Sequence, residues 1–379
     1  MRICVLNWRD LAHPASGGAE IYTEHVLKRW AAQGHQITLV SASVAGRPAR
    51  ETVDGYTVVR VGGRFTVYRE ARRWWQEHGR GQFDVVVDET NTVPFQAHEW
   101  VDDGARTIAL VHQTCEEIWR YNAPWPAGVL GRLVLEPNWL RRLGQAPILA
   151  VSASTAESVA RFGARDVTVV PEGFEPPATL PQVTKESRPT VVFCARMVPY
   201  KRPEDVVRAV ELAARHLPGL QAWMIGGGPD LKRLKASAPP SVTFWGRVDE
   251  DTKMDLMARA HVHVATSIRE GWGLVVSEAA ALGTPTISYD TPGLRDSTSA
   301  AGGVVIPPSP EALAHWLTEL LPVWQTQTPV HLDHGGAHSW DHVAAEVLAA
   351  VEEHATVPAA GLHPQSPAVA DIAPHRRAA

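Results

Sequence analysis

The chain has 379 residues, which is long for one hydrophobic core and suits two domains of ordinary size. Its composition, 45% hydrophobic and 20% charged, is typical of a globular protein and not of a disordered one. With a net charge of −5, the chain as a whole lacks the basic field that is typical of nucleic-acid binding, so we expect no nucleic-acid partner.

The first predicted element is a strand at residues 2–7, whose apolar run is too short for the core of a secretory signal. No stretch of about 18 apolar residues follows it, so the sequence predicts no membrane-spanning helix. The cysteines Cys4, Cys115 and Cys194 are scattered and lack the spacing of a disulfide scaffold or a metal site. We therefore expect a cytoplasmic protein.

Short runs of apolar and β-branched residues then alternate with longer helical patterns along the whole chain. The first series of predicted strands covers residues 2–7, 35–43, 56–61, 83–89, 107–113, 148–154 and 167–172. A second series covers residues 189–196, 220–228, 241–246, 261–267, 284–290 and 302–307. Nearly continuous apolar strands that alternate with helices predict an α/β fold with doubly wound parallel sheets.

A segment without periodicity, residues 175–188, separates the two series and is rich in Pro, Thr and charge. It predicts an N-terminal Rossmann-like domain at residues 1–174 and a C-terminal one at residues 189–338. We expect the helix at about 340–354 to pack back on the first domain, and residues 355–379 to be a disordered tail. A ligand would then bind in the central cleft, at the carboxyl ends of both sheets.

The loop after the first strand contains Ser16, Gly17 and Gly18, just before a predicted helix. Glycine lets the backbone approach a ligand closely, and a helix N-terminus presents unpaired N–H groups to an anion. The dinucleotide pattern GxGxxG and the P-loop pattern are both absent. An ordinary loop explains these glycines equally well.

The loop after the first strand of the second series carries Arg196 and Lys201, ahead of a helix that Pro203 is expected to open. Two fixed cations at this edge of a sheet suit a pyrophosphate, because they stabilise the charge of a departing phosphate. The alternative is a pair of solvated surface cations.

Residues 269–278, REGWGLVVSE, place Glu270 in a loop and Glu278 about one turn inside the following helix. This spacing favours two carboxylates that flank an anion site over an acid and a base that face each other. The glycines permit a tight backbone whose N–H groups point at one phosphate, and the residues concerned are Gly271, Trp272, Gly273, Leu274 and Val275. A helix with an incidental glutamate in its first turn would explain Glu278 but not the Gly-Trp-Gly loop.

Together these motifs resemble the retaining GT-B glycosyltransferases of family four, also called group 1. The segments that carry the resemblance are GGAE (17–20), HQ (112–113), VSAST (151–155), VPEGF (170–174), ARMVPYKRP (195–203), IGGGPD (225–230), VTFWGRV (242–248) and EGWGLVVSEAAALGTP (270–285). The resemblance spans nearly the whole folded chain. Its strongest parts are the two glutamates and the loop with Arg196 and Lys201.

The resemblance implies a donor site. Glu278 is expected to bind the ribose hydroxyls of a nucleotide, and Glu270 to contact the donor sugar. Arg196 and Lys201 would neutralise the diphosphate, together with the backbone from Gly273 to Val275.

It also implies contacts from other segments. Gly18, with Gly17 beside it, would lie under the phosphate or sugar, and His112 would approach the transferred sugar. Arg247 and Val248 would flank the base. Two residues depart from the family pattern, since Ala195 replaces a common glycine and Glu172 replaces a common asparagine.

Two further patterns have competing interpretations. The acidic run 249–251 fits a metal signature, but its position before a helix predicts an N-terminal cap, so we expect no metal site. Residues 68–80 and 139–143 mix aromatic side chains with arginine, and either contact a membrane surface or form ordinary amphipathic helices.

The sequence thus predicts a metal-independent enzyme that moves a sugar from a nucleotide diphosphate to an acceptor hydroxyl, with retention of configuration and no cofactor. The acceptor is a saccharide, a lipid-linked sugar or a natural-product aglycone. Two alternatives are another GT-B enzyme, such as a non-hydrolysing epimerase, and a catalytically silent nucleotide-sugar-binding subunit.

Overall fold

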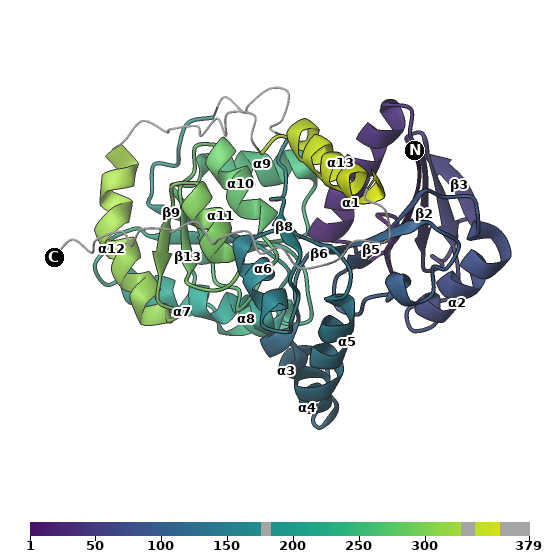
Figure 1. Ribbon diagram of the computed structural model, residues 1–379. Coiled ribbons are helices and arrows are strands. Elements are labelled where there is room, and N and C mark those ends of the chain that lie inside the picture. The colour runs from purple at the N-terminus through teal and green to yellow at the C-terminus, as the bar shows by residue number, and fades with distance from the viewer. Residues whose placement is uncertain (176–182, 327–337, 357–379) are drawn as a thin grey trace, which may run out of the picture.

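The computed structural model describes residues 1–175, 183–326 and 338–356, and these form two α/β units side by side (Figure 1). The first sheet has the strand order β3-β4-β2-β1-β5-β6-β7-β8. Its strands are β1 (Arg2–Leu6), β2 (Gln36–Ser41), β3 (Arg50–Val53), β4 (Tyr56–Arg60), β5 (Val85–Thr90), β6 (Arg106–Val111), β7 (Ile148–Ala150) and β8 (Val167–Val169).

The second sheet has the order β11-β10-β9-β12-β13-β14 and is parallel throughout. Its strands are β9 (Thr190–Cys194), β10 (Gln221–Ile225), β11 (Val242–Gly246), β12 (Val262–Ala265), β13 (Thr286–Tyr289) and β14 (Val304–Ile306). The predicted fold class, with two doubly wound sheets, is therefore confirmed.

Strand β1 shows why the apolar runs predict sheets covered on both faces. Ile3 and Val5 belong to one core cluster, whereas Cys4 and Leu6 belong to another on the opposite face. Helix α1 (Gly18–Ala32) packs on the first face and α2 (Val67–Trp74) on the second. Alternate side chains of a strand point to opposite faces, so an all-apolar strand is stable only where helices cover both faces of the sheet.

In the second half, α7 (Pro203–Ala213) and α12 (Pro310–Thr326) cover one face of the sheet. Helices α9 (Glu250–Arg259) and α10 (Leu274–Ala281) cover the other. The remaining helices of this half are α8 (Leu231–Ser237) and α11 (Leu294–Ala300). No helix in the described ranges is both long and apolar enough to cross a bilayer.

The last described helix, α13 (Trp340–Thr356), returns to the N-terminal half, where it lies against α1 (Figure 1). The Trp30 indole donates to the Ala344 carbonyl at 2.9 Å, and Val343 and Val347 join the core of the first sheet. Residues 176–182 of the expected linker and 357–379 of the expected tail lie outside the described residues.

Three predictions about strands need correction. The sequence analysis missed β3, an edge strand that pairs antiparallel with β4 across Asp54 and Gly55. Both turn residues have positive φ, at 44° and 87°, which is the geometry an Asp-Gly hairpin adopts. The expected strand at 148–154 ends at Ala150, because Ser152 already caps α6 (Ala153–Ala160), and that at 167–172 ends at Val169.

Candidate functional site

Glu270 and Lys201 form an ion pair at the carboxyl edge of the second sheet. Glu270 lies in the loop between β12 and α10, and the Ser267 hydroxyl donates to the same carboxylate oxygen at 2.6 Å. Thr266 Oγ1 donates to the Lys201 carbonyl at 2.8 Å and so joins the two loops. Burial alone would lower the pKa of Lys201, but Glu270 holds it above its ordinary value, so the ammonium stays charged.

Arg196 is exposed and follows β9 in the loop that ends at Lys201. Its charge acts to lower the pKa of Lys201, so the two cations are neighbours. The glycine-rich segment at 225–228 supports this loop, since Met197 N donates to the Gly227 carbonyl at 2.9 Å. A Cβ on Gly228 would come within 2.8 Å of the Met197 nitrogen, which explains the glycine there.

Gly271 brings the Glu270 loop against the N-terminal half. A Cβ at Gly271 would overlap the carbonyl oxygen of His112 and lie 3.3 Å from a methyl group of Val151. Thr155 Oγ1 donates to the same carbonyl at 3.3 Å. The structure therefore brings His112 and Glu270, predicted from distant segments, to one place.

The His112 ring is buried, and neither ring nitrogen has a hydrogen-bond partner in the described part of the chain. Its Nε2 lies 3.7 Å from Glu89 Oε2, and the Tyr22 ring meets it edge-on at 5.2 Å. Glu89 in turn accepts from Asn7 Nδ2 at 2.6 Å and Thr23 Oγ1 at 2.5 Å. Burial opposes protonation, yet Glu89 keeps the pKa of His112 above its ordinary value. The imidazole can thus donate to a hydroxyl group.

The N-termini of α1 and α10 converge on each other. A Cβ on Gly18 would lie 3.5 Å from Leu274, and the Leu274 side chain packs against the first core. Gly17 N donates to Glu20 Oε2 at 2.6 Å, and Arg9 Nη2 lies 2.9 Å from Glu20 Oε1. Two helix N-termini that meet create a positive field suited to phosphate oxygens.

Gly273, at the N-cap of α10, has φ of 100°, a conformation that glycine adopts without strain. The side chain of Trp272 is buried, and its indole donates to Ser277 Oγ at 3.1 Å. The Trp272 ring is therefore part of the packing. The predicted anion contact therefore falls to the backbone of this segment and not to the indole.

Glu278 lies on α10 with its Oε2 3.0 Å from the Lys253 ammonium, which also contacts Glu250 at 2.6 Å. Burial raises the pKa of Glu278, and Lys253 partly offsets the shift. Lys253 belongs to α9, and no motif in the sequence marked it.

The two residues expected near the base directly follow β11. Val248 packs in one cluster with Val275 and Cys194. Arg247 is exposed and lies over Gly227, with its Cγ 3.1 Å from a Cβ placed there.

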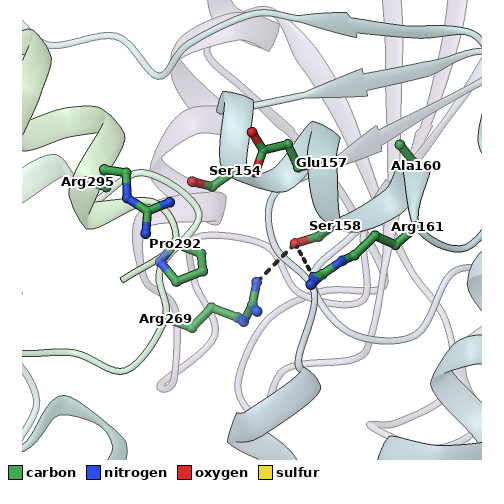
Figure 2. Close-up of a pocket in the computed structure, with 8 residues that line it drawn as sticks. All are labelled: Ser154, Glu157, Ser158, Ala160, Arg161, Arg269, Pro292 and Arg295. Atoms are coloured by element: carbon green, nitrogen blue, oxygen red, sulfur yellow. Dashed lines mark hydrogen bonds between the residues drawn. The ribbon is translucent and has the colours of Figure 1, made fainter. Parts of the chain in front are cut away.

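Arg269 is a site residue that the sequence analysis missed. Its Nη1 donates to Thr114 Oγ1 and to Ser158 Oγ, each at 3.2 Å, and its Nη2 lies 3.2 Å from Glu116. Figure 2 shows the guanidinium pointing at Ser158. Both residues line a pocket of about 600 Å³. The pocket also contains Arg161, which pairs with Glu116 at 2.8 Å.

Glu172, which departs from the family pattern, is buried after β8. Burial raises its pKa to about 7; the charges of His112 and Lys201 oppose the shift, whereas Glu270 adds to it. The charges of three predicted catalytic residues therefore act on this carboxyl.

The acidic run at 249–251 acts as a helix cap, as predicted. Asp249 accepts from Thr252 N at 2.8 Å and precedes the first turn of α9. This carboxylate is thus committed to the helix N-terminus.

Comparisons with known proteins relate the chain to glycosyltransferases. The family model described as Glycosyl transferases group 1 matches residues 180–328, and the model described as Glycosyltransferase Family 4 matches residues 16–176. The chain is 23% identical to a glycogen synthase of Mycobacterium tuberculosis over 336 residues, 78% of this chain and 80% of that one. It is 32% identical over 210 residues to a GDP-mannose-dependent phosphatidylinositol monomannoside mannosyltransferase of the same organism, 48% and 54% of the two chains.

Solved structures share the fold at low sequence identity. Sucrose-phosphate synthase of Thermosynechococcus elongatus superimposes with a TM-score of 0.65 at 18% identity, over 93% of this chain and 96% of that one. HepE of Anabaena, in complex with UDP-glucose, gives a TM-score of 0.68 at 15% identity, over 93% and 100%.

Proposed function

Because the chain belongs to the group 1 glycosyltransferases, we propose that it moves a sugar from a nucleotide diphosphate to an acceptor hydroxyl, with retention of configuration. The observation that carries this proposal is the Lys201–Glu270 pair, which lies next to Arg196. The relatives include a GDP-mannose-dependent enzyme, and a structural neighbour holds UDP-glucose, which supports a nucleotide-sugar donor.

In this proposal the diphosphate of the donor enters between the N-termini of α1 and α10. Lys201 leaves its pair with Glu270 and, with Arg196, holds the phosphate oxygens. Fixed cations stabilise the negative charge that develops as the sugar–phosphate bond breaks, which is often the largest catalytic contribution. They supply the charge that a metal ion provides elsewhere, so we propose metal-independent transfer.

Glu270, once released by Lys201, accepts from a hydroxyl of the donor sugar, and His112 donates to the sugar from the opposite side. Glu278 accepts from the ribose hydroxyls, and its partner Lys253 opposes the rise in pKa that burial causes. For retention, the acceptor oxygen bonds to the anomeric carbon on the face from which the diphosphate departs, and the departing phosphate oxygen takes the acceptor's proton. No side chain then needs to act as a strong base.

The proposal is tested with a panel of nucleotide sugars that includes UDP-glucose and GDP-mannose. A true donor raises the melting temperature in a concentration-dependent manner, since it binds only the folded state. With that donor and simple sugar acceptors, product or free nucleoside diphosphate forms in the presence of EDTA. Epimerised donor without transfer, or complete loss of turnover with EDTA, would contradict the proposal.

A further inference from the structure

A helical hairpin projects from the N-terminal half below the sheet (Figure 1). It comprises α3 (Trp119–Asn122), α4 (Ala127–Leu130), a π-helical turn at residues 131–135 and α5 (Glu136–Leu143). Two segments were considered for membrane contact from the sequence. Residues 68–80 lie outside the hairpin, and residues 139–143 lie at the base of the hairpin, away from its tip. Their large side chains turn inward, since Trp75, Leu140 and Leu143 are buried.

At the tip of this hairpin, residues 125–135, the large apolar side chains face solvent and small residues face the interior, whereas an ordinary surface helix does the opposite. Gly128 and Gly131 face inward, where a Cβ on Gly128 would come within 2.8 Å of the Trp119 carbonyl. The outward positions are apolar, and of twelve exposed large hydrophobic residues in the described part of the chain, six lie here. These are Trp125, Val129, Leu130, Leu133, Val134 and Leu135, with exposed fractions of 84, 44, 51, 66, 53 and 36%.

The hairpin is held firmly, so this exposure is a property of the fold. The buried Glu136 carboxylate accepts from the backbone N–H of Glu116 and from the Trp119 indole, both at 2.8 Å. It also accepts from Cys115 N at 2.5 Å. Contiguous apolar surface maintained in this way marks a binding surface.

The charge of the hairpin favours an anionic partner over a second copy of this chain. Between residues 119 and 143 the charged residues are four arginines and one glutamate, and that glutamate, Glu136, is buried. Arg120, Arg132 and Arg141 are exposed, on a chain whose net charge is −5. A symmetric contact between two copies would place these arginines against each other, whereas an anionic surface attracts them.

We propose that the hairpin tip docks on an anionic phospholipid bilayer. Trp125, Leu130 and Leu133 enter the boundary between headgroups and acyl chains, while Arg120 and Arg132 contact lipid phosphates. Arginine suits this role because its guanidinium binds phosphate through paired N–H groups. Docking is independent of the transfer reaction proposed above, so either proposal can fail without the other.

Co-sedimentation with vesicles tests the docking. The wild-type chain should bind vesicles of equal parts phosphatidylglycerol and phosphatidylcholine, bind pure phosphatidylcholine weakly, and detach as salt is raised. The double variant Leu130→Glu/Leu133→Glu should bind at least roughly tenfold more weakly, because it removes apolar anchors and adds repulsion. The double variant Arg120→Gln/Arg132→Gln should lose the preference for phosphatidylglycerol.

Matched controls are Val323→Glu, an exposed apolar residue of α12, and Arg208→Gln, a surface arginine of α7; both should bind as the wild type does. Unchanged circular dichroism and melting temperature would show that each variant is folded. No binding to anionic vesicles would overturn the proposal, as would equal binding by the hairpin variants. So would a wild-type dimer in light scattering that Leu133→Glu converts to a monomer.

Discussion

Arg269 Nε donates to Glu117 Oε2 at 3.1 Å and so joins the two halves of the chain. Arg269 directly precedes Glu270, and Thr114, another of its partners, follows His112 by two residues. The guanidinium therefore fixes the loop that carries Glu270 against the loop that carries His112. Its side chain is only 4% exposed, so water competes little for these bonds.

Arg269→Ala should weaken both stability and catalysis. Loss of the guanidinium leaves buried acceptors unpaired, which costs about 1–3 kcal/mol. The kcat/KM for sugar transfer should fall by more than the loss of folded protein explains, because His112 and Glu270 are no longer held together. Urea unfolding and kcat/KM give the two measurements.

Arg295→Ala is the matched control, because Arg295 lines the same pocket but is 48% exposed and pairs with the exposed carboxylate of Asp290 (Figure 2). It should change stability by less than about 1 kcal/mol. Equal effects of the two substitutions on stability and kcat/KM would show that they arise from the pocket lining and not from the contacts by which Arg269 joins the two halves.

Gly271→Ala should impair catalysis while the protein stays folded. The added methyl group overlaps the His112 carbonyl, so the two halves must separate slightly at the site. A displacement of about 1 Å at a reacting centre costs on the order of 10²-fold in rate. Transfer kinetics test this, with Gly63→Ala as control, where the nearest atom is 4.0 Å from the new Cβ. Full activity of Gly271→Ala would mean that this contact does not position the site.

The fold could be predicted because apolar strands and helical periods are local properties of the sequence. The donor side of the site followed, since chain order places Arg196, Lys201 and Glu270 at one edge of a parallel sheet. Edge strand β3 was missed because Arg50 and Glu51 give it no apolar pattern.

Side-chain contacts between segments distant in the sequence were out of reach of the same reasoning. Arg269 resembles any surface arginine until the fold brings Glu117 and Ser158 to it. Lys253 pairs with Glu278 only because α9 and α10 lie side by side on one face. Neither pairing has a spacing signal, because it depends on how the helices and loops pack.

Lys201→Met should lower kcat by on the order of 10²–10³-fold, as loss of one preorganised donor to a transition state does. Donor affinity should change much less, because Arg196 and the helix N-termini still hold the diphosphate in the ground state. Rapid-quench turnover and equilibrium binding of the nucleotide separate the two effects. Lys232→Met, at an exposed lysine of α8, serves as the control. Equal losses in kcat and in donor affinity would show that Lys201 only binds the donor and does not stabilise the transition state.

Glu172→Gln should stabilise the protein in a way that depends on pH. Burial raises the pKa of Glu172 from 4.5 to about 7, against the charges of His112 and Lys201. Below pH 4.5 the carboxyl is protonated in both the folded and the unfolded chain, so wild type and variant should differ by a constant. As pH rises from 4.5 through 7, the unfolded chain loses its proton first, and the wild type loses stability that the neutral amide retains.

The gain of the variant should therefore grow across that window and level off above pH 7. Its upper limit is about 3 kcal/mol, at about 1.4 kcal/mol for each pKa unit. Unfolding free energies of both proteins, measured between pH 4 and 8, give the difference curve directly. A flat curve for Glu172→Gln would mean that Glu172 is ionised in the folded protein, with its charge balanced by His112 and Lys201.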